Sequence, residues 1–155
     1  MGRLFPNGPA AGGGLVSGVA AAIKHHSNAR VVAVEPAGAP TMYLSKQAGK
    51  AVELDTSKYS TIAHGLAAPF AGPISFENVK AFVDEIVLVT DDELREATRF
   101  MWEQGFVTET SGCAALAAVR AGKLGDLTGK TVACTVSGRN IDAAEMLHEV
   151  FNHKL

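Results

Sequence analysis

The chain has 155 residues, of which 47% are hydrophobic, and a formal net charge of −2. This predicts one globular domain with a substantial core and excludes disorder for most of the chain. Without a block of like charges, neither nucleic acid nor an anionic membrane is expected as the main partner. Cys113 and Cys134 lie far apart, and the sequence has neither a signal-peptide pattern nor a membrane-length apolar run. We therefore expect a cytoplasmic protein with reduced cysteines.

A glycine-rich turn precedes the first expected helix. Gly12, Gly13 and Gly14 run into an alanine-rich segment. The residues at helical spacing there, which we expect to face the core, are Leu15, Val19, Ala22 and Ile23. Glycines at a helix entrance permit positive φ, and the free amides of the first turn favour an anion such as a phosphate. The alternative is a turn that only lets the helix pack closely.

Two common nucleotide-binding motifs do not match this turn. A P-loop requires a lysine where Val19 stands, and a dinucleotide fingerprint requires a glycine one position before Gly18. A strand normally precedes such loops. Here the chain begins almost at the glycines, so we expect that strand to be missing or vestigial.

Strands and helices are expected to alternate through the rest of the chain. The expected strands cover residues 31–34, 51–54, 86–89 and 131–136, and residues 55–77 are expected to be largely irregular. The expected helices cover 40–47, 76–83, 113–121 and 142–151, with one more between a capping box at 90–93 and Gly105. This order predicts an α/β fold with a mostly parallel sheet flanked by helices. Its ligand would lie at the carboxyl ends of the strands, near Glu35, Thr90 and Ser137.

Six segments stand in a specific order and spacing. They are Ala-Gly-Gly-Gly-Leu at 11–15, Val-Glu-Pro at 34–36 with Gly-Ala-Pro-Thr at 38–41, Thr-Ile-Ala-His-Gly-Leu at 61–66, the segment from Asp84 to Leu94, the segment from Glu109 to Leu116, and Ser-Gly-Arg-Asn at 137–140. Together they resemble the C-terminal half of fold-type II pyridoxal-phosphate enzymes of the threonine dehydratase and serine racemase family. The resemblance covers nearly all of the chain.

The resemblance implies a fold, a cofactor and a reaction. The fold would be an incomplete three-layer domain like the large domain of tryptophan synthase β, with residues 1–155 running from the glycine loop to the C-terminal helix. The cofactor would be pyridoxal 5′-phosphate. The substrate would be a small amino acid, L-threonine or L-serine, converted by β-elimination to a 2-oxo acid and ammonia.

The resemblance also implies roles for individual residues. The residues that would hold the cofactor phosphate are Ala11, Gly12, Gly13, Gly14 and Leu15. Ser137 would hydrogen-bond the pyridine nitrogen, and Glu109 would orient the cofactor and substrate. Some members bind a divalent cation through a glutamate, a backbone carbonyl and an aspartate; Glu35 and Ala39 match the first two, but Thr41 replaces the aspartate. We therefore expect no metal there.

Other departures from the family pattern concern the active site. Ala11 replaces a glycine, His64 replaces the aspartate of the Thr-Ile-Ala-Asp-Gly segment, and Arg139 replaces the second glycine of Ser-Gly-Gly-Asn. The family's Schiff-base lysine stands upstream of the glycine loop, within a small domain, and this chain begins after that point. Finally, Glu145, His148 and Glu149 share one face of the last expected helix. This spacing could bind a metal, but we prefer the interpretation that the three residues form an exposed polar face.

Three hypotheses follow. The first is a fragment of a threonine or serine ammonia-lyase that supplies half an active site and works only with the missing half, from a longer chain or a partner polypeptide. The second is a non-catalytic remnant or dimerisation module that keeps the phosphate pocket. The third is a racemase or another eliminating enzyme of the same fold. Apolar surface left by a missing half predicts association, including formation of a homo-oligomer.

Overall fold

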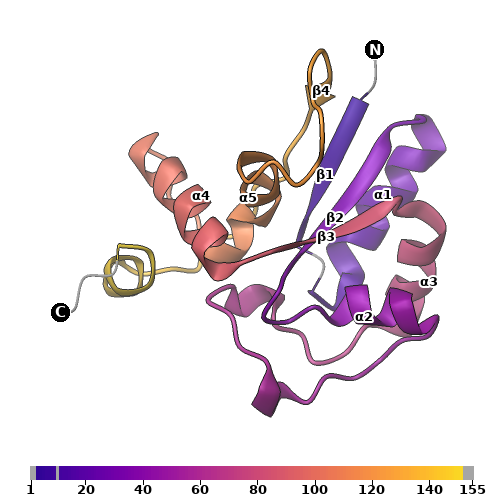
Figure 1. The fold of residues 1–155 in the computed structure, drawn as a ribbon, viewed down its shortest axis with the longest axis horizontal. Coiled ribbons are helices and arrows are strands. Elements are labelled where there is room, and N and C mark those ends of the chain that lie inside the picture. Colours follow the sequence, from indigo (N-terminus) through magenta and orange to yellow (C-terminus); the bar gives the residue numbers. More distant parts are fainter. Residues whose placement is uncertain (1–2, 10, 152–155) are drawn as a thin grey trace.

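The computed structural model describes residues 3–9 and 11–151. A parallel sheet with the strand order β3-β2-β1-β4 lies at its centre (Figure 1). Its strands are β1 (Arg3–Pro9), β2 (Arg30–Pro36), β3 (Glu85–Val89) and β4 (Thr131–Val132). The parallel α/β fold predicted from the sequence is therefore confirmed.

Helices cover both faces of this sheet and make three layers (Figure 1). One face carries α1 (Gly14–His26) and α3 (Pro73–Phe82), and the other carries α5 (Ala114–Arg120) with α4 (Asp91–Glu103) packed against it. The shorter elements are α2 (Thr41–Ala48), α6 (Ala143–Glu145), the 3-10 turns η1 (Ala11–Gly13), η2 (Thr56–Lys58), η3 (His64–Leu66) and η4 (Thr110–Cys113), and the π-helical turn η5 (Met146–Val150).

The central strand β2 divides the core in two. Val31 and Ala33 pack with residues of α1 and α3, whereas Val32 and Val34 pack with residues of α4 and α5. A strand buried on both faces carries apolar residues at successive positions, because neighbouring side chains point to opposite faces. The continuous apolar run in the sequence therefore predicted this strand correctly.

Local capping signals are also confirmed. The Thr90 hydroxyl accepts the Glu93 N–H at 3.2 Å, and the Glu93 carboxylate accepts the Thr90 N–H at 2.8 Å. These two bonds form the predicted capping box of α4. Gly105 follows this helix with φ of 82°, and Gly49 ends α2 with φ of 69°.

Two expectations near the N-terminus are wrong. The strand before the glycines is present as β1, because it gains neighbours on both sides, β2 and β4. The buried face of α1 is also offset from the expected stripe: Val16 and Ala20 are fully buried, whereas Leu15 is 45% exposed. The direction in which the loop enters α1, together with the packing of α1 on α3, determines which face of α1 is buried. The spacing of apolar residues alone does not determine it.

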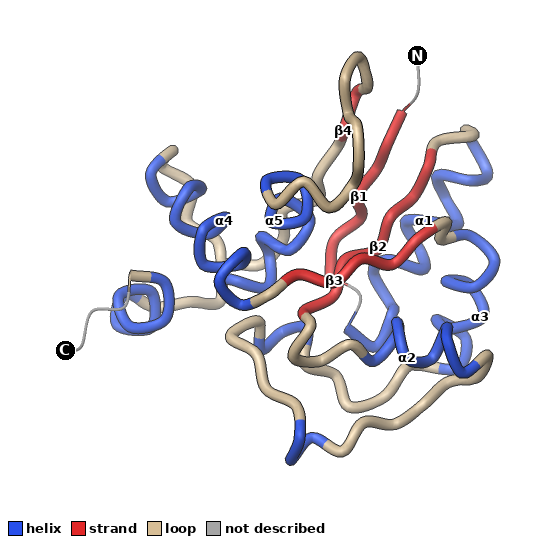
Figure 2. Tube along the Cα trace, in the orientation of Figure 1, coloured by secondary structure: helices blue, strands red, loops and turns tan. Residues whose placement is uncertain are grey.

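Three later elements are shorter than expected. Residues 51–54 form only an isolated bridge between Glu53 and Phe70, and the strand expected over 131–136 ends at Val132. β4 lies at the edge of the sheet, and its pairing with β1 stops at Leu4 and Val132, although β1 itself continues to Pro9. The expected last helix is divided between α6 and η5. The irregular segment after α2 extends to residue 72 and passes the carboxyl ends of the central strands (Figure 2).

Candidate active site

The glycine turn lies at the carboxyl end of β1 and adopts the conformation that only glycine takes readily. Gly12 and Gly13 have φ of 52° and 85°, and α1 begins at the next residue. A Cβ on Gly13 would lie 2.4 Å from the Met42 Cε and 2.8 Å from the Ser75 Cβ. The Gly12 carbonyl accepts the Gly72 N–H at 3.0 Å. Packing against α2 and α3 therefore holds the turn in place.

The first turn of α1 is arranged to receive an anion. Among the described residues, no side chain caps this helix at Gly13, and its first turn contains no acidic residue. A Cβ on Gly14 would meet no described atom within 4 Å. Uncapped amides and the positive end of a helix dipole both attract negative charge. The turn thus has the chemistry of a phosphate site.

A pocket of about 380 Å³ lies beside η4. Its lining comes from three separate segments: Ile62, His64 and Gly65; Glu109, Thr110 and Ser111; and Arg139, Asn140, Ile141, Asp142 and Glu145. Acidic, basic and hydroxyl groups all contribute, so the lining offers charge and hydrogen-bond partners to a small polar molecule. Of the residues assigned a cofactor or substrate role in the sequence, Glu109 lies in this lining.

Glu109 is held in place by contacts with Gly138. Its N–H donates to the Gly138 carbonyl at 3.3 Å, and the Thr108 hydroxyl donates to the same carbonyl at 3.1 Å. Gly138 has φ of 81°, and a Cβ on it would lie 1.9 Å from the Glu109 Oε1. The glycine therefore makes room for the Glu109 carboxylate.

Ser137 is positioned differently from the prediction. We expected a buried strand to deliver it to the ligand, but that strand ends at Val132. Instead, the Ser137 N–H donates to the Gly112 carbonyl at 3.4 Å, and a Cβ on Gly112 would lie 1.6 Å from the Ser137 carbonyl oxygen. Close backbone contact with η4 therefore positions Ser137, and Ser137 lies outside the lining of the 380 Å³ pocket.

The predicted motifs nevertheless meet at one end of the sheet. The glycine turn η1 contacts η3, and η3 contacts η4, which follows Glu109. The Gly65 N–H donates to the Ser111 hydroxyl at 3.0 Å. The pocket is lined by residues around η3 and η4 and by the segment 139–145, and its lining does not include Gly12, Gly13, Gly14 or Leu15.

The two weak metal candidates have structural roles. Glu35 is fully buried, and its two carboxylate oxygens accept the N–H groups of Met42 at 2.9 Å and Tyr43 at 2.8 Å. Burial raises the pKa of Glu35 to about 7, although the two amide hydrogen bonds act in the opposite direction. Ala39 donates its N–H to the Pro36 carbonyl at 3.0 Å. Glu35 thus caps α2 from the neighbouring strand.

Sequence reasoning missed the residue that anchors the segment around His64. The Asp91 carboxylate accepts the Thr61 hydroxyl at 2.5 Å and the Ile62 N–H at 3.2 Å. The Thr110 hydroxyl donates to the Ile62 carbonyl at 2.7 Å. In the sequence, Asp91 lies inside the capping box expected at 90–93, and no local signal indicates a partner 30 positions away.

Comparisons with known proteins place this geometry in context. A family described as pyridoxal-phosphate dependent enzyme matches residues 8–138. The L-threonine ammonia-lyase of Thermotoga maritima is 39% identical over 149 residues, which are 95% of this chain and 36% of that protein. The serine racemase of Schizosaccharomyces pombe is 37% identical over 139 residues, which are 88% of this chain and 42% of that protein.

The fold agrees with these relatives. The solved structure of the processed form of threonine deaminase isoform 2 from Solanum lycopersicum superimposes with a TM-score of 0.87 at 31% identity, covering 98% of this chain and 44% of that one. The chain therefore spans less than half the length of each of these proteins. Within the described residues, no helix combines the length and hydrophobicity needed to cross a membrane.

Proposed function

This chain belongs to the family of pyridoxal-phosphate dependent enzymes, and from that premise we propose that it is part of a threonine or serine ammonia-lyase. The reaction is β-elimination of L-threonine or L-serine to a 2-oxo acid and ammonia. Relatives named L-threonine ammonia-lyase, at 39% identity, support this reaction. Because the chain covers only 36% of the first of these, the proposal concerns a protein that contains further segments.

The glycine turn is the observation that carries the proposal. Gly12 and Gly13 hold left-handed conformations directly before an uncapped helix, which suits the phosphate of pyridoxal phosphate. We assign phosphate binding to the amides of Gly12, Gly13, Gly14 and Leu15, with Ala11 beside them. When bound, the cofactor supplies a sink for the electron pair released as the Cα proton leaves.

The residues on the other side of η3 have positioning roles in this proposal. Glu109 lines the pocket and is fixed by Gly138, so it can orient a substrate or cofactor group. Ser137 would offer a neutral hydroxyl to the pyridine nitrogen of a bound cofactor. The lysine that forms the Schiff base is supplied by the rest of a longer chain or by a partner polypeptide.

Binding of pyridoxal phosphate to the purified chain tests the proposal. We expect saturable binding, followed by absorbance, that inorganic phosphate displaces. Gly13→Ala should weaken it by roughly tenfold or more, because the new Cβ would overlap Met42 and Ser75. Gly18→Ala, in the helix that follows the turn, is the control, since its Cβ would meet nothing within 4 Å. Equal affinities of the two variants would contradict the assignment.

Covalent trapping and turnover separate the hypotheses. Borohydride treatment with pyridoxal phosphate, followed by intact mass, should give no adduct at a single lysine of this chain. Release of 2-oxo acid from L-threonine or L-serine is then expected only when the remaining segments are supplied. A chain that binds cofactor but stays inactive with those segments supports the non-catalytic module instead.

Racemisation is the second candidate within the family. A relative named serine racemase is 37% identical over 88% of this chain, close to the identity of the ammonia-lyases. Chiral analysis of serine after incubation with the completed protein distinguishes the two activities. Formation of D-serine without 2-oxo acid would favour the racemase.

A further inference from the structure

Three side chains from two distant segments of the chain converge beside the pocket. They are His64 of η3, Glu145 at the end of α6, and Glu149 of η5. One ligand-type atom from each lies within 4.8 Å of the other two, and the His64 Nε2 lies 3.2 Å from the Glu149 Oε1. His64 and Glu145 also line the 380 Å³ pocket.

The second oxygen of Glu149 is a separate sign of a missing partner. The Glu149 side chain is 18% exposed, and its Oε2 is buried with no hydrogen-bond partner among the described residues. A buried carboxylate oxygen without a partner is costly, because it has lost water and gained nothing. A cation held by both oxygens of Glu149, with Oε1 beside His64, would satisfy this second oxygen.

We propose that His64, Glu145 and Glu149 bind one divalent transition-metal ion, with Zn²⁺ as the best fit. One imidazole nitrogen and two carboxylates match the ligand types of Zn²⁺, whereas Mg²⁺ and Ca²⁺ prefer oxygen alone. With a neutral imidazole, the two carboxylates balance the charge of the ion. Ligand atoms about 2.1 Å from a tetrahedral metal lie about 3.4 Å apart, close to the His64–Glu149 separation of 3.2 Å.

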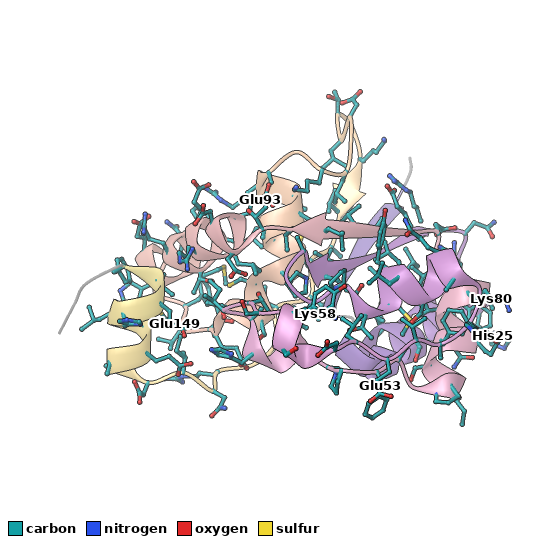
Figure 3. All side chains as sticks on the ribbon, turned by 60° about the horizontal axis from the view of Figure 1, so that its bottom comes forward. His25, Glu53, Lys58, Lys80, Glu93 and Glu149 are labelled. Atoms are coloured by element: carbon teal, nitrogen blue, oxygen red, sulfur yellow. The ribbon has the colours of Figure 1, made fainter. Side chains whose placement is uncertain are left out.

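The fold already orients the helical side of this site. Arg95 Nε donates to the Glu149 carbonyl at 2.8 Å, and Arg99 donates to the Val150 carbonyl at 2.8 Å. The Glu145 N–H is capped by Asp142 at 2.8 Å. These bonds fasten η5 and the start of α6, so only small side-chain rotations are needed to gather the ligands. Figure 3 shows Glu149 on this C-terminal segment, at the far end of the molecule from His25.

Metal binding would fasten the C-terminal segment to the rim of the pocket. His64 belongs to the segment anchored by Asp91, whereas Glu145 and Glu149 belong to the last helical elements. A shared ion joins the two and limits how far that wall can open. The site does not depend on the proposed ammonia-lyase activity.

Calorimetric titration of the purified chain with Zn²⁺ tests the proposal. We expect one ion per chain, and a loss of affinity of roughly tenfold or more in His64→Ala and in Glu149→Gln. Mg²⁺ should bind far more weakly than Zn²⁺. Because His64 is exposed, His64→Ala should fold as the parent does, which circular dichroism checks.

Control variants remove the other metal-binding groups. The first control is His148→Ala, which removes a histidine of η5 that is not part of the cluster. The second is the double variant His25→Ala, His26→Ala, which removes two histidines at the other end of the molecule. Both should bind Zn²⁺ as the parent does. Co²⁺ should give visible ligand-field bands without an intense thiolate charge-transfer band, since neither cysteine takes part. Zn²⁺ binding that survives His64→Ala, depends on His25 and His26, or shows a thiolate band would overturn the proposal, as would no stoichiometric binding.

Discussion

The Glu109 carboxylate lies against the backbone of Gly138, so closely that a Cβ there would be 1.9 Å from the Glu109 Oε1. The same two residues are joined through the backbone, where the Glu109 N–H donates to the Gly138 carbonyl at 3.3 Å. One glycine thus gives a pocket carboxylate its position and links η4 to the segment that carries Ser137 and Arg139.

Gly138→Ala should displace Glu109 and destabilise the chain. The substitution adds a steric overlap to the strain of a positive φ, and we expect a loss of more than about 2 kcal/mol in urea unfolding. Gly125→Ala is the matched control: φ there is 74°, but a Cβ would meet nothing within 4 Å. Equal losses of stability in the two variants would mean that the positive φ alone causes the loss and that the contact with Glu109 contributes nothing.

Asp91→Ala should release the segment from Thr61 to Gly65. Its carboxylate accepts two hydrogen bonds from that segment, and bonds to a charged acceptor contribute about 1.5–3 kcal/mol each. Amide hydrogen exchange of residues 61–65 should therefore accelerate strongly. Asp92→Ala, which removes a neighbouring carboxylate that is 89% exposed, should change the exchange little. Similar protection in both variants would contradict this role of Asp91.

The free energy of unfolding should fall as the pH rises, because Glu35 then loses its proton. Burial raises its pKa from 4.5 to about 7, so the folded state binds a proton more tightly than the unfolded state. That contribution is complete below pH 4.5 and is lost as the pH rises to about 7, a change of roughly 3 kcal/mol. Glu35→Gln should unfold at urea concentrations that vary less between pH 5 and pH 8. Parallel curves for the parent and Glu35→Gln would contradict the assignment.

We propose that the isolated chain associates with itself through apolar surface near the glycine turn. Ile74 is 81% exposed and Phe70 is 57% exposed, and both flank Gly72, which binds the turn. Sedimentation velocity should show mass increasing with concentration, and Ile74→Glu should reduce it. Ala81→Glu, at an exposed position of the same helix, is the control for one added negative charge. A monomer at all concentrations with a cooperative melt would contradict the proposal.

Several elements were predictable because their signals are local. The capping box of α4 depends on residues three positions apart, and the strand β2 depends on an unbroken apolar run. Elements that need a partner were predicted poorly. Residues 51–54 and 133–136 have strand-like composition, but only pairing makes a strand. The first segment forms a single bridge, and the second leaves β1 after Val132.

By itself, the sequence determined the parallel α/β class, the left-handed glycine turn before α1, and the order of motifs that the family shares. Only the tertiary structure decided that Glu35 turns inward to cap α2, that Asp91 anchors the segment around His64, and that His64 meets Glu149. The physical reason is range. Dihedral preference and periodicity act within a few residues, whereas the His64–Glu149 contact joins positions 85 residues apart and exists only after the layers have packed.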